Sequence, residues 1–197
     1  MSRIVAFENV TLDGVMQAPA YKDEDTRGGF EHGGWATPYQ DEEAAKAAST
    51  GMAETTGVLL GRVTYEDFAS VWPKQPDNPF GKFLNATRKY VASTTLEEPL
   101  AWDNSTLLEG DVTDAVGRLR AERDQNLLLL GSGQLFRALL EANLVDEVTL
   151  QIHPLVLGTG LRLFDGDGGG GGALARFKLA SSSTTSKGVV VATYRPG

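Results

Sequence analysis

The stretch from Leu127 to Phe136 constrains the fold of this chain more than any other. Four consecutive leucines, bounded by polar residues and by glycine, predict a short strand buried on both faces. Such strands are typical of parallel sheets covered by helices. Gly131 and Gly133 then allow a sharp turn, and Ser132 can cap a following helix. The chain therefore begins to look like an α/β protein at this point.

The segment after this turn is amphipathic and is expected to end near Asn143. Its apolar residues recur at helical spacing and share one face, namely Leu135, Phe136, Leu139 and Leu140. A strand, a glycine turn and a helix start together present free N–H groups and the positive helix end to an anion. The default occupant is a phosphate of a nucleotide cofactor. An ordinary tight turn is the alternative, because Gly-Ser-Gly is shorter than the full dinucleotide fingerprint.

Composition excludes several classes of protein. The 197 residues fit one domain, 1–197, and no apolar run approaches the length of a membrane span. The absence of cysteine excludes disulfides, thiolate metal sites and cysteine nucleophiles, and it fits a cytoplasmic protein. We expect no signal peptide, because a strand-like segment starts at once. A net charge of -8 argues against a nucleic-acid partner.

The first fifty residues contain one strand that ends in a polar turn, a long irregular stretch and a helix. Residues 4–10 predict a strand that runs into Asp13-Gly14, a turn pair. Residues 17–40 form a long irregular stretch whose aromatic residues either anchor it to the core or line a pocket. A helix over 41–54 follows, with Asp41 able to cap it.

A strand over 56–60 ends at Gly61, which opens another helix. Arg62 and Thr64 lie beside the start of that helix, where a guanidinium and a hydroxyl suit a phosphate. The alternative is a surface arginine paired with Glu66 or Asp67.

The remaining pattern continues the alternation of helices and strands. Helices are expected over 78–86 and 112–119, and strands over 88–93, 106–108 and 145–152. The strand over 88–93 ends in three hydroxyl residues, Ser93, Thr94 and Thr95, which suit a phosphate, a ribose or a plain loop. The glycine tract over 165–172 is interpreted as a surface loop. Strands over 175–184 and 189–194 form a hairpin.

Four of these segments, in this order, resemble dihydrofolate reductases. Gly61-Arg62-x-Thr64-Tyr65-Glu66, Val91-Ala92-Ser93-Thr94 and Leu130-Gly131-Ser132-Gly133-Gln134-Leu135-Phe136 are similar to their cofactor-binding segments. Leu144 to Glu147 and Pro154 to Phe164, with Asp13-Gly14, resemble one branch more closely. That branch is the reductase domain of the bacterial bifunctional deaminase-reductases of riboflavin synthesis, with its stand-alone relatives.

The resemblance implies a dihydrofolate reductase-like three-layer α/β/α fold with a mostly parallel central sheet and a C-terminal antiparallel hairpin. It implies that NADPH binds in an extended pose across strand ends, with three junctions, starting at Gly61, Ser93 and Gly131, together in space. Arg62 and Thr64 would hold its phosphates, and Ser93, Thr94 and Thr95 would lie at the adenosine end. The turn residues Gly131, Ser132, Gly133, Gln134, Leu135 and Phe136 would cradle the pyrophosphate and approach the nicotinamide. Leu12, Asp13 and Gly14 would border the nicotinamide and the substrate.

The function expected on these grounds is an NADPH-dependent reductase. Hydride would pass to a C=N or C=O carbon of a small, pterin- or pyrimidine-like substrate. Asp13 is the first candidate proton donor and Asp41 the second, with ordered water and a purely capping role as alternatives. His32 and His153 are weaker candidates, and a histidine before proline at a strand end is interpreted as structural.

Three further expectations complete this interpretation. A catalytically silent NADP(H)-binding sensor or scaffold is the alternative function. The zinc pattern of the deaminase half is absent from the sequence, so no metal is expected. A homodimer is expected from the family's habit and from the apolar segment 154–164.

Overall fold

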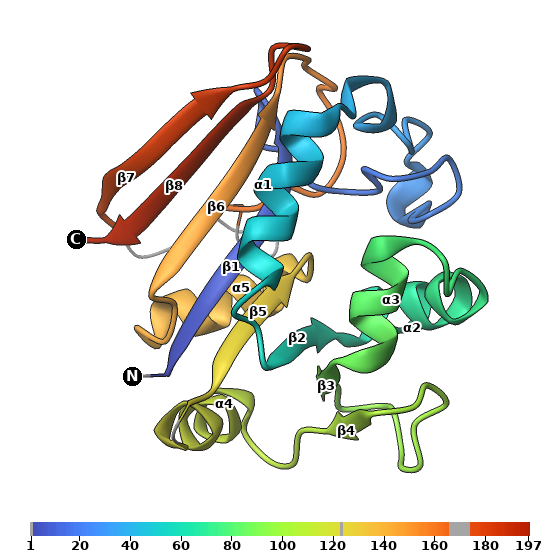
Figure 1. The fold of residues 1–197 in the computed structure, drawn as a ribbon, viewed down its shortest axis with the longest axis vertical. Coiled ribbons are helices and arrows are strands. Elements are labelled where there is room, and N and C mark those ends of the chain that lie inside the picture. The colour runs from blue at the N-terminus through green and yellow to red at the C-terminus, as the bar shows by residue number, and fades with distance from the viewer. Residues whose placement is uncertain (1, 123, 166–173) are drawn as a thin grey trace. The chain divides into compact units, whose positions relative to one another are not determined.

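The computed structural model describes residues 2–122, 124–165 and 174–197. The chain, drawn in Figure 1 from blue at the N-terminus to red at the C-terminus, divides into two compact units. Unit one comprises Met1–Ala6 and Ser49–Asp146, and unit two comprises Phe7–Ala48 and Glu147–Gly197. Strand β1 (Arg3–Thr11) passes from unit one into unit two. The single domain over 1–197 stays a prediction.

Unit one is built on parallel strands. They are β2 (Gly57–Gly61), β3 (Arg88–Ala92), β4 (Ser105–Leu107) and β5 (Asn126–Leu130), in the order β4-β3-β2-β5 and followed by the start of β1. β2 pairs in parallel with both β3 and β5. Leu127 to Leu130 are all buried, as the leucine run predicted.

The register of these strands brings their carboxyl ends to one edge. Gly61 lies opposite Ala92, and Leu59 lies opposite Leu129. The residues that follow, starting with Arg62, Ser93 and Gly131, therefore leave the strands at the same edge. The expectation that three junctions come together is confirmed within unit one.

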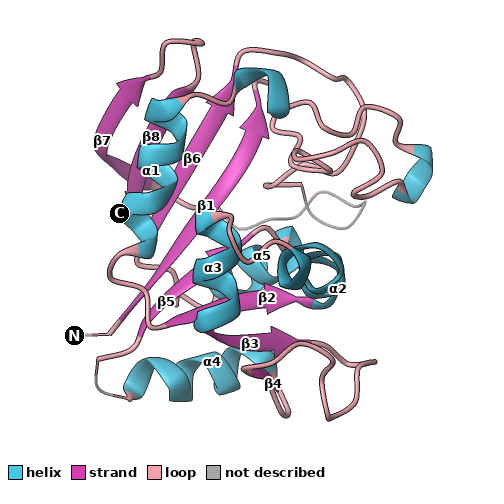
Figure 2. Cartoon of the chain, turned by 45° about the vertical axis from the view of Figure 1, so that its right-hand side comes forward, coloured by secondary structure: helices cyan, strands magenta, loops and turns pink. Residues whose placement is uncertain are grey.

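The helices of unit one begin close to where the sequence predicted. They are α2 (Arg62–Val71), α3 (Pro79–Ala86), α4 (Val112–Ala121) and α5 (Gly133–Glu141). The side chain of Asn78 caps α3, and that of Asp111 caps α4. α2 packs against β2 and β3, and α5 packs against β2 (Figure 2).

Unit two carries the antiparallel part of the fold. Here β6 (Glu147–His153) pairs with β8 (Val190–Pro196), and β8 pairs with β7 (Phe177–Thr184), both antiparallel. The predicted hairpin is thus confirmed. The end of β1 neighbours β6 in the strand order. Helix α1 (Glu42–Met52) begins in this unit and is capped by Asp41, whose Oδ1 accepts from the Ala44 N–H at 2.8 Å.

The long segment over 17–40 is anchored by its own apolar core. Phe30 and Trp35 are buried with Val15, Ala18 and Ala36. The Trp35 indole N–H donates to the Gln17 carbonyl at 2.7 Å. The segment contains two short 3-10 turns, Arg27–Gly29 and Thr37–Tyr39. For Trp35, anchoring to the core is therefore the interpretation that the structure supports.

Most of the glycine tract over 165–172 lies outside the described residues. Among the residues that are described, no helix has the length and apolarity needed to cross a membrane.

Candidate functional site

The first candidate site lies in unit one, where β2 and β5 give way to helices. Ser132 Oγ accepts a hydrogen bond from the Gly61 N–H at 2.8 Å and donates to Thr64 Oγ1 at 2.9 Å. A Cβ on Gly131 would lie a tight 3.3 Å from Thr64 Oγ1, and the φ of 55° at this position is in the left-handed region that favours glycine. The two glycine turns found in the sequence are thus tied to each other through a pair of hydroxyls.

The role predicted for Ser132 as a helix cap is wrong. Ser132 has left-handed backbone angles (φ 62°, ψ 54°), and its side chain makes no capping bond to α5. An N-cap side chain works from extended backbone angles, where it can reach the second or third N–H. Here the hydroxyl turns toward β2 and leaves the start of α5 without a side-chain cap.

The starts of α2 and α5 share an electrostatic feature. Neither has a side-chain cap, and neither has an acidic residue in its first turn. By contrast, Asp41 caps α1 and Asp111 caps α4. A helix start without a side-chain cap carries partial positive charge from its aligned peptide dipoles. The shared edge of β2 and β5 therefore favours an anion.

The other predicted cofactor residues of unit one lie around this edge. Arg62 pairs with Glu66 at 2.8 Å, as the alternative interpretation expected, but both side chains are exposed. Such a pair contributes only about 0.3–0.5 kcal/mol, so the guanidinium can turn to a phosphate at little cost. Ser93 Oγ accepts from the N–H groups of Thr95 and Leu96 and closes a turn after β3.

The remaining predicted residues differ in exposure. Thr94 and Thr95 are exposed, and Gln134 lies in the first turn of α5. Leu135 and Phe136 are buried, with 5% and 0% of their surface exposed. Their apolar side chains hold α5 in the core, so Leu135 and Phe136 can offer a ligand only their backbone. Cofactor binding by these residues stays a prediction.

Asp13 lies in unit two as the centre of a hydrogen-bond cluster. Its carboxylate accepts from the Thr11 hydroxyl at 2.6 Å and from the N–H groups of Leu157 and Gly158 at 3.2 and 2.9 Å. The Arg162 guanidinium lies 3.4 Å away. The hydrogen bond from Thr11, with those from Gly158 and Leu157, lowers the pKa of Asp13 to about 2. The carboxylate fastens the segment after β6 to the end of β1.

Leu12 and Gly14, on either side of Asp13, shape this turn through their backbone. The Leu12 N–H donates to the Leu155 carbonyl at 2.9 Å, and the Leu12 side chain is 64% exposed. Gly14 has a φ of 80°, which disfavours any side chain at this position.

Asp41 is a second structural carboxylate of unit two. Besides capping α1, its Oδ2 accepts from the Ser186 hydroxyl at 2.8 Å, in the turn between β7 and β8. The hydrogen bond from Ala44 leads the effects that lower the pKa of Asp41 to about 2. Asp13 and Asp41 are therefore both anions near neutral pH, a state that cannot donate a proton.

A group that the sequence did not single out as a site surrounds His153 at the end of β6. His153 Nε2 lies 3.1 Å from Asn9 Oδ1 on β1, and the ring is buried. Trp35 and Tyr39 contact the ring edge-on, with centroids 5.1 and 5.7 Å away. Two features of the sequence could have indicated this group: the His153-Pro154 pair at a strand end and Asn9 in the first strand. Neither feature is specific by itself.

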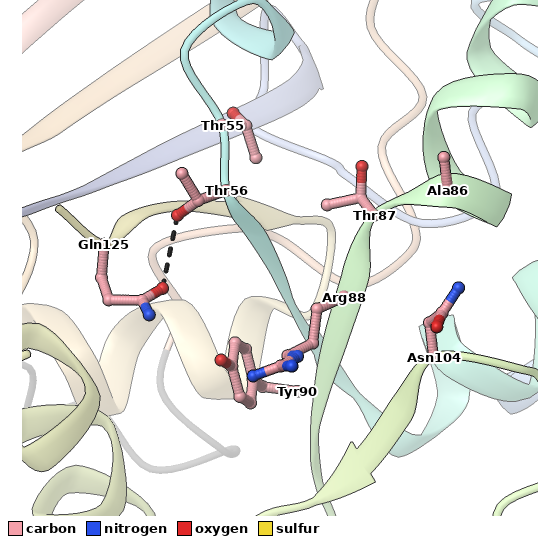
Figure 3. A pocket seen from close by; sticks show the side chains of 8 residues that line it. All are labelled: Thr55, Thr56, Ala86, Thr87, Arg88, Tyr90, Asn104 and Gln125. Atoms are coloured by element: carbon pink, nitrogen blue, oxygen red, sulfur yellow. Dashed lines mark hydrogen bonds between the residues drawn. The ribbon is translucent and has the colours of Figure 1, made fainter.

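A concavity of about 510 Å³ lies at the opposite ends of the strands of unit one (Figure 3). It is lined by residues that precede or open the strands and by α3's end, namely Thr55, Thr56, Ala86, Thr87, Arg88, Tyr90, Asn104 and Gln125. None of the predicted site residues lines it. Within this lining, the Thr56 hydroxyl donates to Gln125 Oε1 at 3.3 Å. In the described part of the chain, no group of acidic residues and histidines could hold a metal ion.

Parallel strands whose carboxyl ends lead into helices, followed by an antiparallel hairpin, define an α/β protein with antiparallel strands at the C-terminal end of the chain. The chain belongs to the RibD C-terminal domain family, whose model matches residues 3–191. It is 30% identical over 142 residues to YyaP, an uncharacterized protein of Bacillus subtilis, covering 70% of this chain and 72% of that protein.

Two solved structures share the fold. One, from Shewanella sp. PV-4, is assigned to riboflavin biosynthesis; it is 22% identical, with a TM-score of 0.73, and 99% of each chain is covered. The other is the diaminohydroxyphosphoribosylaminopyrimidine deaminase/5-amino-6-(5-phosphoribosylamino)uracil reductase of Thermotoga maritima, 19% identical with a TM-score of 0.64. All of this chain matches 57% of that bifunctional chain.

Proposed function

We propose that this protein is an NADPH-dependent reductase that transfers hydride to a C=N or C=O carbon of a small pyrimidine- or pterin-like substrate. The observation that carries the proposal is the edge shared by β2 and β5. Two helix starts without caps or acids are linked there by the Gly61–Ser132–Thr64 hydrogen bonds. Membership of the RibD C-terminal domain family supports a reductase.

The residues of unit one fit the phosphates of the cofactor. The backbone at Gly131 and Gly133 and the start of α2 supply N–H donors, and Arg62 supplies a mobile positive charge. Ser93, Thr94 and Thr95 supply hydroxyls at the next strand end. NADPH, when bound, supplies the hydride, and the protein contributes binding and orientation.

The proton for the reduced product needs a source other than a free carboxylic acid at Asp13 or Asp41. With pKa values of about 2, both groups are ionised at neutral pH. We assign Asp13 the role of holding the segment over 154–164 in place, and Asp41 that of holding α1 to the β7–β8 turn. Ordered water is then the proton source, since a general acid adds only about 10²- to 10⁴-fold in rate.

Two measurements test the proposal. Tryptophan fluorescence titrated with NADPH tests binding, and loss of NADPH absorbance against dihydrofolate, pterins and pyrimidinones tests turnover. We expect saturable NADPH binding and oxidation with at least one substrate class. No NADPH binding would refute the reductase.

The second candidate function is an NADP(H)-binding sensor or scaffold without turnover. Its motivation is that both acids expected to donate a proton are ionised structural groups. Tight NADPH binding with no oxidation across the whole panel would favour it.

A homodimer and a cytoplasmic location complete the proposal. The segment over 154–164 exposes Val156, Leu161 and Phe164, each at least half exposed, as an apolar surface for a second copy. Light scattering at micromolar concentration should give the mass of a dimer, and a monomer would contradict this part. The chain has no cysteine, which fits a reducing compartment.

A further inference from the structure

In the Asn9–His153 pair of unit two, each side chain has one nitrogen without a partner in the described residues. Asn9 Oδ1 can only accept, so the 3.1 Å contact places the proton on His153 Nε2. Burial lowers the pKa of His153 to about 4, so the ring is neutral and carries this single proton. Its Nδ1 is then a bare lone pair, buried with no partner among the described residues.

An unpartnered buried ring nitrogen makes this arrangement costly for folding. The ring is nevertheless held in one orientation. Trp35 and Tyr39 contact it edge-on, at interplanar angles of 86° and 73°. Trp35 is itself fixed by its bond to the Gln17 carbonyl. The ring's orientation therefore determines which way the Asn9 amide points.

This contact also fixes the orientation of the Asn9 Nδ2 amino group. Since Oδ1 is used by His153, the Nδ2 amino group is fixed as a pair of donors. It has no partner in the part of the chain that the structure describes, and Asn9 is half-buried at the carboxyl half of β1. A preoriented donor in such a position is suited to an acceptor oxygen that a ligand brings.

We propose that Asn9 binds a carbonyl oxygen of a planar heterocyclic substrate through Nδ2 and that His153 is the positioning residue that fixes this amide. The inference rests on the proposed reductase function and deepens it, because it names the substrate group that is recognised. A lactam carbonyl of a pyrimidinone or pterin is such an acceptor. The competing view is a structural lock whose amide faces only water.

The first test reads the tautomer directly. In protein labelled with ¹⁵N at histidine, long-range ¹⁵N–¹H spectra at neutral pH should show His153 protonated at Nε2 and bare at Nδ1. Asn9→Ala should change the Nε2 shift and leave exposed His32 unchanged. A proton on Nδ1 would overturn the proposal, whatever the enzyme does with NADPH.

The second test uses uracil as the probe and pyrimidine, the same ring without carbonyl oxygens, as its control. Uracil at millimolar concentration should shift the Asn9 side-chain amide signals, and pyrimidine should not. Uracil should bind about 3- to 10-fold more weakly to Asn9→Ala and to His153→Phe, the worth of one hydrogen bond. His153→Gln, which restores an N–H donor, should recover part of that loss, and His32→Phe should lose nothing.

The outcomes separate this inference from the proposed function. Equal uracil affinity in the wild type and Asn9→Ala, or no uracil shift at Asn9, would overturn the role of Asn9. Equal affinity in His153→Phe would overturn the positioning role of His153. NADPH titration of the same variants is the independent measurement. Absence of NADPH binding would refute the proposed reductase function but would not contradict the contact between Asn9 and a carbonyl oxygen.

Discussion

The Ser132 hydroxyl lies 2.8 Å from the backbone nitrogen of Gly61, seventy-one residues earlier in the chain. This bond and the one to Thr64 join two strand-to-helix turns. Ser132→Ala removes both bonds and leaves the Gly61 N–H without its partner. We expect a loss of about 1 kcal/mol in the free energy of unfolding, and weaker NADPH binding. Urea unfolding and fluorescence titration measure the two effects, with Ser70→Ala on the exposed face of α2 as the control.

Arg62 separates binding from stability. In the described part of the chain Arg62 pairs with Glu66 on an exposed helix face, so Arg62→Met should change the free energy of unfolding by less than about 0.5 kcal/mol. NADPH binding should weaken about tenfold, because charge-assisted bonds to phosphate contribute about 1.5 kcal/mol or more. Arg118→Met on α4 is the matched control. Unchanged NADPH affinity in Arg62→Met would remove Arg62 from the phosphate site.

Asp13 should matter at low pH. Its folded pKa of about 2 lies below the ordinary value of 3.8, so its contribution to stability is present above about pH 4 and is lost as the pH falls toward 2. Asp13→Asn should flatten this part of the stability profile. It should also expose the segment over 154–164 to protease, since Leu157 and Gly158 lose the charged acceptor. An Asp13→Asn profile parallel to that of the wild type would contradict this account.

Lys89 should make the stability of the protein depend on pH in the alkaline range. It is fully buried on β3, where Nζ donates to the carbonyls of Leu84 and Thr87 and lies 4.3 Å from the Trp102 ring centroid. Burial lowers its pKa from 10.5 to about 8. The unfolded chain thus binds more protons between these values, and the wild type should gain stability there as the pH rises. The difference between wild type and Lys89→Met, from urea unfolding at several pH values, should show this rise.

Glu8 should cost stability as the pH rises. Its side chain is buried in β1, with Oε1 unpartnered in the described structure, and burial raises its pKa well above 4.5. The folded state then binds the extra proton, so stability falls with pH from 4.5 up to that raised pKa. Glu8→Gln keeps the shape of the neutral acid. It should be more stable than the wild type at pH 8 and lose that advantage toward pH 4.

The sequence predicted most of the helices and strands well, and the reason is local. The leucine run, the glycines at 61 and 131 and the capping residues Asp41 and Asp111 act within a few residues of their own position. Each element is therefore visible in a short window. Local patterns do not give the order of the strands, because pairing such as that of Gly61 with Ala92 depends on contacts distant in sequence. Only the resemblance to a known family allowed this order to be inferred.

The candidate site was predicted less completely, because its chemistry depends on such distant contacts. Ser132 was expected to bond its own helix and instead bonds Gly61. Asp13 has the carboxyl group of a proton donor, but hydrogen bonds from the nearby Thr11 and from the distant backbone of Gly158 and Leu157 keep it ionised. His153 and Asn9 are 144 residues apart, and no pattern within either strand joins them.

Hydrogen-bond register, rather than any side chain, aligns the ends of β3, β2 and β5. Removing one residue from β2 would shift Gly61 by about 3.3 Å against both neighbours and turn alternate side chains to the other face. We therefore expect homologues to replace many residues within these strands but seldom to delete or insert one. Length changes in relatives should accumulate in the connections instead, which is consistent with a shared fold at 22% identity.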